Sequence, residues 1–214
     1  VWRLDVHDGV MIDTETGVFD DRPLFPGSTS YLDASARADM EEKPCRVSLS
    51  RSFSSVGRFS IEEPYSIEFL IRLNRFPPDF QGVRVFGFLG HVDLEGTPAW
   101  ELRAERSLDT PQQMAWRIPT NEDGKSGSEA FRIFEGITYR CHLEIDPQRE
   151  IWRAGISTRG RSVSNSFQDE IPLNLDSKKT GDSAISTLAC EVIGAKGDDI
   201  SFSVDAIRIQ NRPD

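Results

Sequence analysis

Two short acidic segments carry the residue types that could cleave a glycosidic bond. They are EIDPQRE (144–150) and ELRAE (101–105). A retaining glycosidase needs a nucleophile and an acid/base whose carboxyl groups lie about 5–5.5 Å apart. Either segment could do this chemistry only if the elements around it brought two carboxylates that close together.

EIDPQRE is predicted to be the turn of a β-hairpin. The flanking residues TYRCHLEI and IWRAGI alternate between polar and apolar residues as strands do. Asp146 followed by Pro147 suits the first two positions of a type I turn. Glu144 and Glu150 are then expected to face each other across the turn, so a structural role for these acids is favoured over catalysis.

ELRAE is predicted to be a strand with one charged face, formed by Glu101, Arg103 and Glu105. The apolar residues between and beside them are expected to point to the core: Trp100, Leu102 and Ala104. Residues four apart on a flat strand are separated by about 13 Å, and Arg103 should pair with both glutamates and lower their pKa values. An acid catalyst needs a raised pKa.

Three interpretations of this charged face stay open. The favoured one is a solvated ladder of salt bridges, and the second is a polar ligand-binding face made of Glu101, Arg103 and Glu105. The third is a hydrolase in which Glu101 and Glu105 are the catalytic pair.

Alternation with a period of two dominates the chain, most clearly at YSIEFLIRL (65–73). An edge strand is expected around VWRLDV (1–6), and DASARADMEE (33–42) could make at most a short helix. Further strands are predicted, separated by turn-rich segments. They span residues 45–53, 83–92, 99–105, 113–119, 130–136, 137–145, 150–159, 184–194 and 200–210.

This pattern predicts an all-β fold, a two-sheet antiparallel β-sandwich or jelly roll, as a single domain over residues 1–214. The strands of YSIEFLIRL and of Phe86 and Phe88 should lie near the middle of the sheets. Trp100, Trp116 and Trp152 each alternate in step with apolar residues of their own strands. This alternation places them in the core rather than on a sugar-stacking platform. The core candidates are Phe69, Ile71, Phe86, Phe88, Trp116, Tyr139, Leu143, Ile145, Val204 and Ile207.

Composition argues against two classes of partner. The formal net charge of −10 would repel nucleic acid, and no apolar run is long enough for membrane insertion. The start VWRLDVHDGV lacks the features of a signal peptide, and Val1 in place of Met suggests a processed protein or an excised domain.

No metal site or cofactor is predicted. The three histidines are scattered, and Cys45, Cys141 and Cys190 lack the spacing of a zinc site. Cys141 and Cys190 are expected to be small core hydrophobes, with a bridge between them as the minor alternative. A structural calcium is possible at the turn acids of TNEDGKSG (120–127) and GAKGDDIS (194–201), although neither has a dedicated calcium-loop pattern.

The order of the elements resembles the concanavalin A-like lectin/glucanase superfamily, and in particular the laminin G-like domains of bacterial surface proteins. The similarity covers about residues 45–210 and includes YSIEFLIRL, a Phe-rich strand, a W-x-L strand and a hairpin that opens with GITYR. The closing strand FSVDAIRIQN matches a pattern of hydrophobic residues around an aspartate and an arginine. The matching residues are Val204, Asp205, Ile207, Arg208 and Ile209.

The resemblance implies a module that binds glycans or proteins, often with calcium, or one that hydrolyses polysaccharides. Laminarinase-like members carry Glu-x-Asp-x-Glu on the catalytic strand, whereas this chain has Arg103 at the middle position. The expected function is therefore a non-catalytic, extracytoplasmic module that binds carbohydrate or a surface protein partner. The alternative is a polysaccharide-active glycoside hydrolase with a degenerate carboxylate motif.

Overall fold

The structure, a computed structural model, describes the backbone in thirteen stretches. They are residues 3–7, 11–19, 31–38, 45–52, 62–74, 82–89, 98–106, 113–119, 126–158, 164–166, 170–174, 186–194 and 199–211. Side chains are described for residues 62–74, 98–105, 113–118, 132–158, 170–174 and 202–211.

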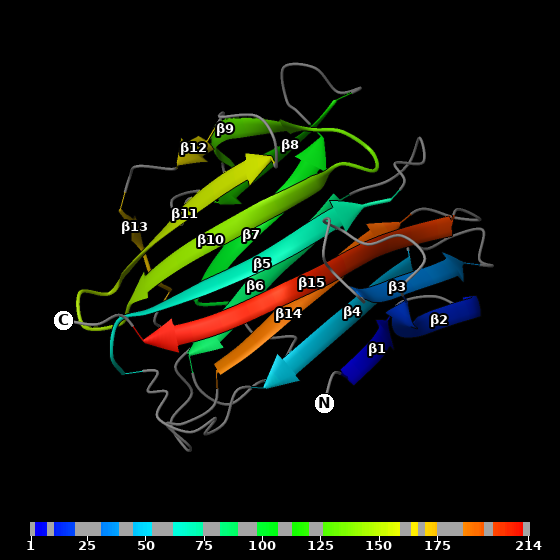
Figure 1. Ribbon diagram of the computed structural model, residues 1–214, viewed down its shortest axis with the longest axis horizontal. Coiled ribbons are helices and arrows are strands. Elements are labelled where there is room, and N and C mark those ends of the chain that lie inside the picture. The colour runs from blue at the N-terminus through cyan, green and yellow to red at the C-terminus, as the bar shows by residue number, and fades with distance from the viewer. Residues whose placement is uncertain are drawn as a thin grey trace.

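Two antiparallel sheets lie face to face, with the larger one towards the viewer in Figure 1. The seven-stranded sheet runs in the order β1 (Arg3–His7), β4 (Cys45–Ser52), β14 (Ser186–Gly194), β6 (Gly82–Leu89), β7 (Trp100–Arg106), β8 (Met114–Pro119) and β9 (Ser126–Ile133). The eight-stranded sheet runs in the order β12 (Ser164–Ser166), β11 (Ile151–Thr158), β10 (Thr138–Asp146), β5 (Tyr65–Leu73), β15 (Asp199–Asn211), β3 (Tyr31–Ala38) and β2 (Met11–Phe19), and β13 (Ile171–Pro172) pairs with β11.

The predicted two-sheet sandwich is confirmed, with β5 and β6 near the middle of their sheets and β1 at an edge. The helix considered for residues 33–42 is wrong, because residues 31–38 form β3, which pairs with β2 on one side and β15 on the other. This tertiary pairing outweighs the weak local preference for helix. No described segment is a helix of the length and hydrophobicity that a membrane span requires.

The strand predicted for residues 130–136 begins earlier and ends earlier, as β9 (Ser126–Ile133). Residues 134–137 instead connect β9 to β10. Gly136 has a positive φ of 69°, and the backbone N–H of Phe134 donates to the Tyr139 hydroxyl at 2.8 Å. The left-handed glycine allows the chain to reverse here.

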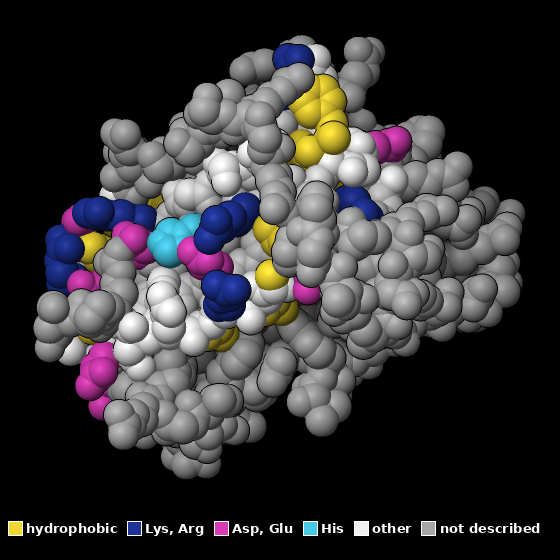
Figure 2. All heavy atoms as spheres, in the orientation of Figure 1, with side chains coloured by type: hydrophobic (Ala, Val, Ile, Leu, Met, Phe, Trp, Pro, Cys, Tyr) yellow, Lys and Arg dark blue, Asp and Glu magenta, His cyan; other side chains and the backbone are white. Residues whose placement is uncertain are grey.

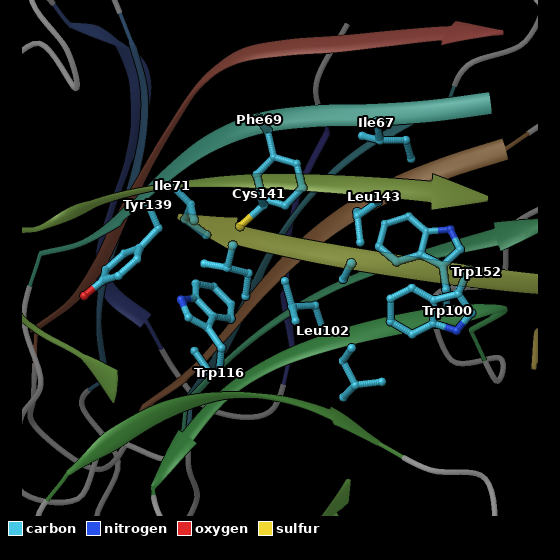
Figure 3. Packing of buried hydrophobic residues seen from close by; sticks show 14 of the residues in the cluster. Ile67, Phe69, Ile71, Trp100, Leu102, Trp116, Tyr139, Cys141, Leu143 and Trp152 are labelled. Atoms are coloured by element: carbon cyan, nitrogen blue, oxygen red, sulfur yellow. The ribbon is translucent and has the colours of Figure 1, made fainter. Parts of the chain in front are cut away.

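Aromatic side chains from the two sheets meet in the core, as Figure 3 shows. The ring centroids of Trp100 in β7 and Trp152 in β11 lie 6.2 Å apart. The ring centroids of Trp116 in β8 and Tyr139 in β10 are also 6.2 Å apart, with the rings edge-on to each other. These three tryptophans are buried, so the prediction that they belong to the core is confirmed.

The other core predictions are confirmed wherever side chains are described. The buried ones are Phe69, Ile71, Trp116, Tyr139, Leu143, Ile145 and Val204, and Ile207 is partly buried against them. The side chains of Phe86 and Phe88 lie outside the described residues.

Cys141 is a buried thiol, so the minor alternative of a bridge to Cys190 is wrong and the small core hydrophobe is confirmed. The side chains of Cys45 and Cys190 lie outside the described residues, as do those of the two turn segments considered for calcium. The alternative of a structural calcium therefore stays open.

Candidate functional site

Strand β7 carries a charged face turned away from the core, which we call the β7 face: Glu101, Arg103 and Glu105, joined by Arg117 of β8. The alternate residues Trp100, Leu102 and Ala104 are buried in the core, as predicted. The two-residue period of the strand is therefore sufficient to separate the charges from the apolar side chains.

The β7 face includes two ion pairs between residues that the structure describes. The Arg103 guanidinium donates from Nε and Nη2 to the two carboxylate oxygens of Glu101, at 2.8 and 2.9 Å. Arg117 Nη1 lies 3.6 Å from Glu105 Oε1. Arg103 and Arg117 are direct cross-strand partners, an arrangement that destabilises a sheet unless acids offset the repulsion. Glu101 and Glu105 supply that compensation.

Burial differs among the four charges. The side chains of Glu101 and Arg117 are only 9% and 3% exposed, whereas those of Arg103 and Glu105 are 39% and 30% exposed. Two charges thus lie beneath the surface of the β7 face, and two are accessible to a ligand. Buried charges need partners, because an unpaired charge would cost several kcal/mol of desolvation.

The sequence prediction for this face is confirmed in its main geometric point, the shared orientation of Glu101, Arg103 and Glu105. Arg103 forms the predicted pair with Glu101, but the predicted pair of Arg103 with Glu105 is wrong. Glu105 instead pairs with Arg117 of β8, which the sequence did not reveal. Arg117 was missed because its pairing depends on the register of β7 against β8, which no local pattern encodes.

The EIDPQRE segment forms the predicted turn between β10 and β11. Asp146 Oδ1 accepts hydrogen bonds from the backbone N–H groups of Gln148 and Arg149 at 3.1 and 3.0 Å. The expected pairing of Glu144 with Glu150 is wrong, because Glu144 pairs in register with Arg153. Glu150 remains within the turn with a φ of 57°, a left-handed conformation.

A second polar cluster lies on the outer face of the eight-stranded sheet, where Figure 2 shows acidic, basic and histidine side chains in one band. Arg140 Nη2 donates to Glu68 Oε2 at 2.8 Å, and His142 Nδ1 lies 3.2 Å from Glu68 Oε1. His142 Nε2 lies 3.3 Å from Glu144 Oε1. These residues converge only because β5 and β10 pair, so the sequence alone did not bring them together.

Acidification is expected to weaken the fold through Glu68. The hydrogen bond from Arg140 lowers the Glu68 pKa below its ordinary value of 4.5. A carboxyl group with a lowered folded-state pKa contributes stability above pH 4.5, and this contribution is lost as the pH falls through the folded-state pKa. Melting temperatures from pH 7 to pH 3 should therefore fall less steeply for Glu68→Gln than for the wild type.

Glu63→Gln is the matched control, since Glu63 is an exposed acid before β5. It should follow the wild-type pH profile. Parallel profiles for the wild type and Glu68→Gln would show that the Glu68 contacts contribute nothing to stability.

Comparison with known proteins identifies the fold. No family model and no curated protein matches the sequence. The catalytic domain of a GH131 β-glucanase from Podospora anserina matches with a TM-score of 0.60, over 97% of this chain and 85% of that chain, at 10% identity. The catalytic domain of a glycoside hydrolase family 131 protein from Coprinopsis cinerea gives 0.57, over 92% and 78%, at 13% identity.

A lectin shares the same architecture. Winged bean acidic lectin, solved with methyl-α-D-galactose, matches with a TM-score of 0.51, over 98% of this chain and 100% of that chain, at 9% identity. The chain therefore has the concanavalin A-like lectin/glucanase fold, as the resemblance implied. Assignment to laminin G-like domains within that fold stays a prediction.

Proposed function

We propose that the protein is a non-catalytic carbohydrate-binding module that holds a glycan on the β7 face through Glu101, Arg103 and Glu105. We also place it outside the cytoplasm. The fold supports the proposal, because it occurs in a β-glucanase domain and in a lectin solved with a galactose derivative. A fold by itself assigns no activity, so the chemistry of the β7 face must carry the argument.

The bidentate contact between Arg103 and Glu101 is the observation that carries the proposal. Two parallel N–H···O bonds fix the plane of the guanidinium, while 39% of the arginine side chain stays exposed. A donor held in place before binding reduces the entropy that a ligand must overcome. Sugar hydroxyls can both donate and accept, so they suit a surface that presents Arg103 beside the half-exposed Glu105.

The same contact favours binding over hydrolysis. A general acid must hold a proton that it can give to the leaving group, and both carboxylate oxygens of Glu101 instead accept hydrogen bonds from Arg103. Glu105 lies beside a second cation, Arg117. Both glutamates of the β7 face are therefore engaged in ion pairs with arginines.

Arg103→Ala is expected to weaken glycan binding roughly ten- to a hundredfold, because a hydrogen bond to a charged group is worth about 1.5–3 kcal/mol. An array of β-glucan oligosaccharides and galactosides would first identify the ligand class, and calorimetry would then measure the affinities. The control is Arg149→Ala, which removes an exposed arginine in the β10–β11 turn. Equal affinities for the wild type and Arg103→Ala would remove the β7 face from the proposal, and a blank array would favour a protein partner.

The hydrolase alternative has a separate test with Glu101→Gln/Glu105→Gln. The wild type is expected to release no reducing ends from β-glucan. Hydrolysis by the wild type that disappears in this double variant would establish the enzyme and overturn the proposal. In that case Glu101 and Glu105 would be the acid and nucleophile.

A further inference from the structure

A hollow of about 490 Å³ lies on the outer face of the eight-stranded sheet, over β5, β10, β11 and β15. We call it the β15 hollow. Its volume falls within the range of roughly 300–1,000 Å³ that is usual for small-molecule sites. The hollow and the β7 face belong to different sheets, so the proposed function makes no use of it.

A β-bulge in β15 shapes one wall of the hollow. Asp205 pairs with Leu70 and Arg208 pairs with Glu68, so two residues of β15, Ala206 and Ile207, oppose a single residue of β5. In a regular strand, residues three apart would lie on opposite faces. The bulge resets the alternation, and Arg208 therefore reaches the outer face while Ile207 packs against the core.

This bulge carries backbone strain. Ala206 has a φ of 52°, in the left-handed region, and its N–H donates to Asp205 Oδ1 at 2.6 Å. A left-handed conformation is unfavourable for a non-glycine residue, because the Cβ atom comes too close to the following carbonyl oxygen. Strained residues of this kind cluster at binding sites and beside re-aimed side chains, and here the re-aimed side chain is Arg208.

The lining residues that the structure describes carry a net positive charge, although the whole chain is acidic. Among them, Arg140 and Arg208 are cations and Glu68 is an anion. Glu68 already accepts a hydrogen bond from Arg140 and contacts His142. The Arg208 side chain is exposed and makes no ion pair or hydrogen bond with the residues that the structure describes.

The remaining lining residues add an apolar surface and hydroxyl groups, the two kinds of contact that a sugar ring can use. Leu70 provides an apolar surface, and Thr138, Ser157 and Thr158 provide hydroxyls. A pyranose ring has an apolar C–H face and polar hydroxyl edges, and such a ring could lie on Leu70 with its hydroxyls towards Ser157 and Thr158. An arginine fork is suited to a carboxylate, because two parallel N–H···O bonds can form.

We propose that the β15 hollow is a second glycan site, specific for a sugar that carries a carboxylate, in which Arg208 binds the carboxylate and Arg140 adds a neighbouring positive charge. The ligand class is a uronic acid residue of an acidic oligosaccharide. Neutral glycans would lack the group that Arg208 recognises. This site is independent of the β7 face.

The test is calorimetry with tri-galacturonic acid and its fully methyl-esterified form, which has the same rings without the charges. The wild type is expected to bind the acid at least tenfold more tightly than the ester, because a charge-assisted pair is worth about 1.5–3 kcal/mol. Arg208→Gln should lose that advantage. Arg208→Lys should retain part of it, since lysine keeps the charge and lacks the fork.

Two arginine variants separate this site from the rest of the surface. Arg149→Gln removes a surface arginine that is not part of the hollow and should leave binding of the acid unchanged, as should Arg103→Gln on the opposite sheet. The proposal is overturned if the acid does not bind, if the ester binds equally well, or if Arg208→Gln binds like the wild type. A loss with Arg103→Gln would instead assign the acid to the β7 face.

Discussion

Replacement of Trp116 by alanine is expected to lower the free energy of unfolding by about 3–5 kcal/mol, the usual cost of truncating a buried aromatic residue. Trp116 is fully buried in β8 and contacts Tyr139 of the opposite sheet edge-on, with ring centroids 6.2 Å apart. Its removal would leave a cavity between the sheets rather than within one of them. Urea unfolding followed by circular dichroism measures the effect.

Phe134→Ala is the matched control for this prediction. Phe134 is also aromatic, but it lies in the connection between β9 and β10 with 55% of its surface exposed. Its truncation should change the free energy of unfolding by no more than about 0.5 kcal/mol, as is usual for surface sites. Similar losses for both variants would contradict the central role assigned to Trp116 in joining the sheets.

The sandwich was predictable because burial in a strand alternates and local sequence records that alternation. YSIEFLIRL identifies β5 and its buried face without any knowledge of its neighbours. The bulge at Ala206 was not predictable in the same way, because nothing in DAIRIQ marks a left-handed alanine. Without the bulge, regular alternation from the buried Val204 would place the Arg208 side chain in the core and the Ile207 side chain on the outer face.

In the candidate sites, too, features of a single strand were predictable from the sequence, and contacts between strands were not. The common face of Glu101, Arg103 and Glu105 is a property of one strand, and the sequence was enough to find it. The pair between Arg117 and Glu105 and the cluster around Glu68 depend on which strands are neighbours and in which register. Register is set by tertiary packing, so charged residues from separate strands remain unconnected in the sequence.

Arg117→Ala is expected to destabilise the fold by about 3 kcal/mol, at the lower end of the range for breaking a buried ion pair. The Arg117 side chain is only 3% exposed, and its loss would leave the carboxylate of Glu105 without the cation 3.6 Å away. The cost should stay at the lower end because Glu105 is 30% exposed and retains contact with water. Relief of the repulsion between Arg117 and its cross-strand neighbour Arg103 reduces the cost further.

A double-mutant cycle with Glu105→Ala isolates the ion pair from the packing of the arginine stem. Residues in direct contact usually show coupling of about 0.5–3 kcal/mol, and a value in that range is expected here. Arg117→Met preserves most of the stem volume, so it should lose less stability than Arg117→Ala. If Arg117→Ala and the exposed control Arg149→Ala both lowered the free energy of unfolding only slightly and to the same extent, the charges of the β7 face would not be structurally coupled. Arg103 would then have to orient its ligand without support from β8.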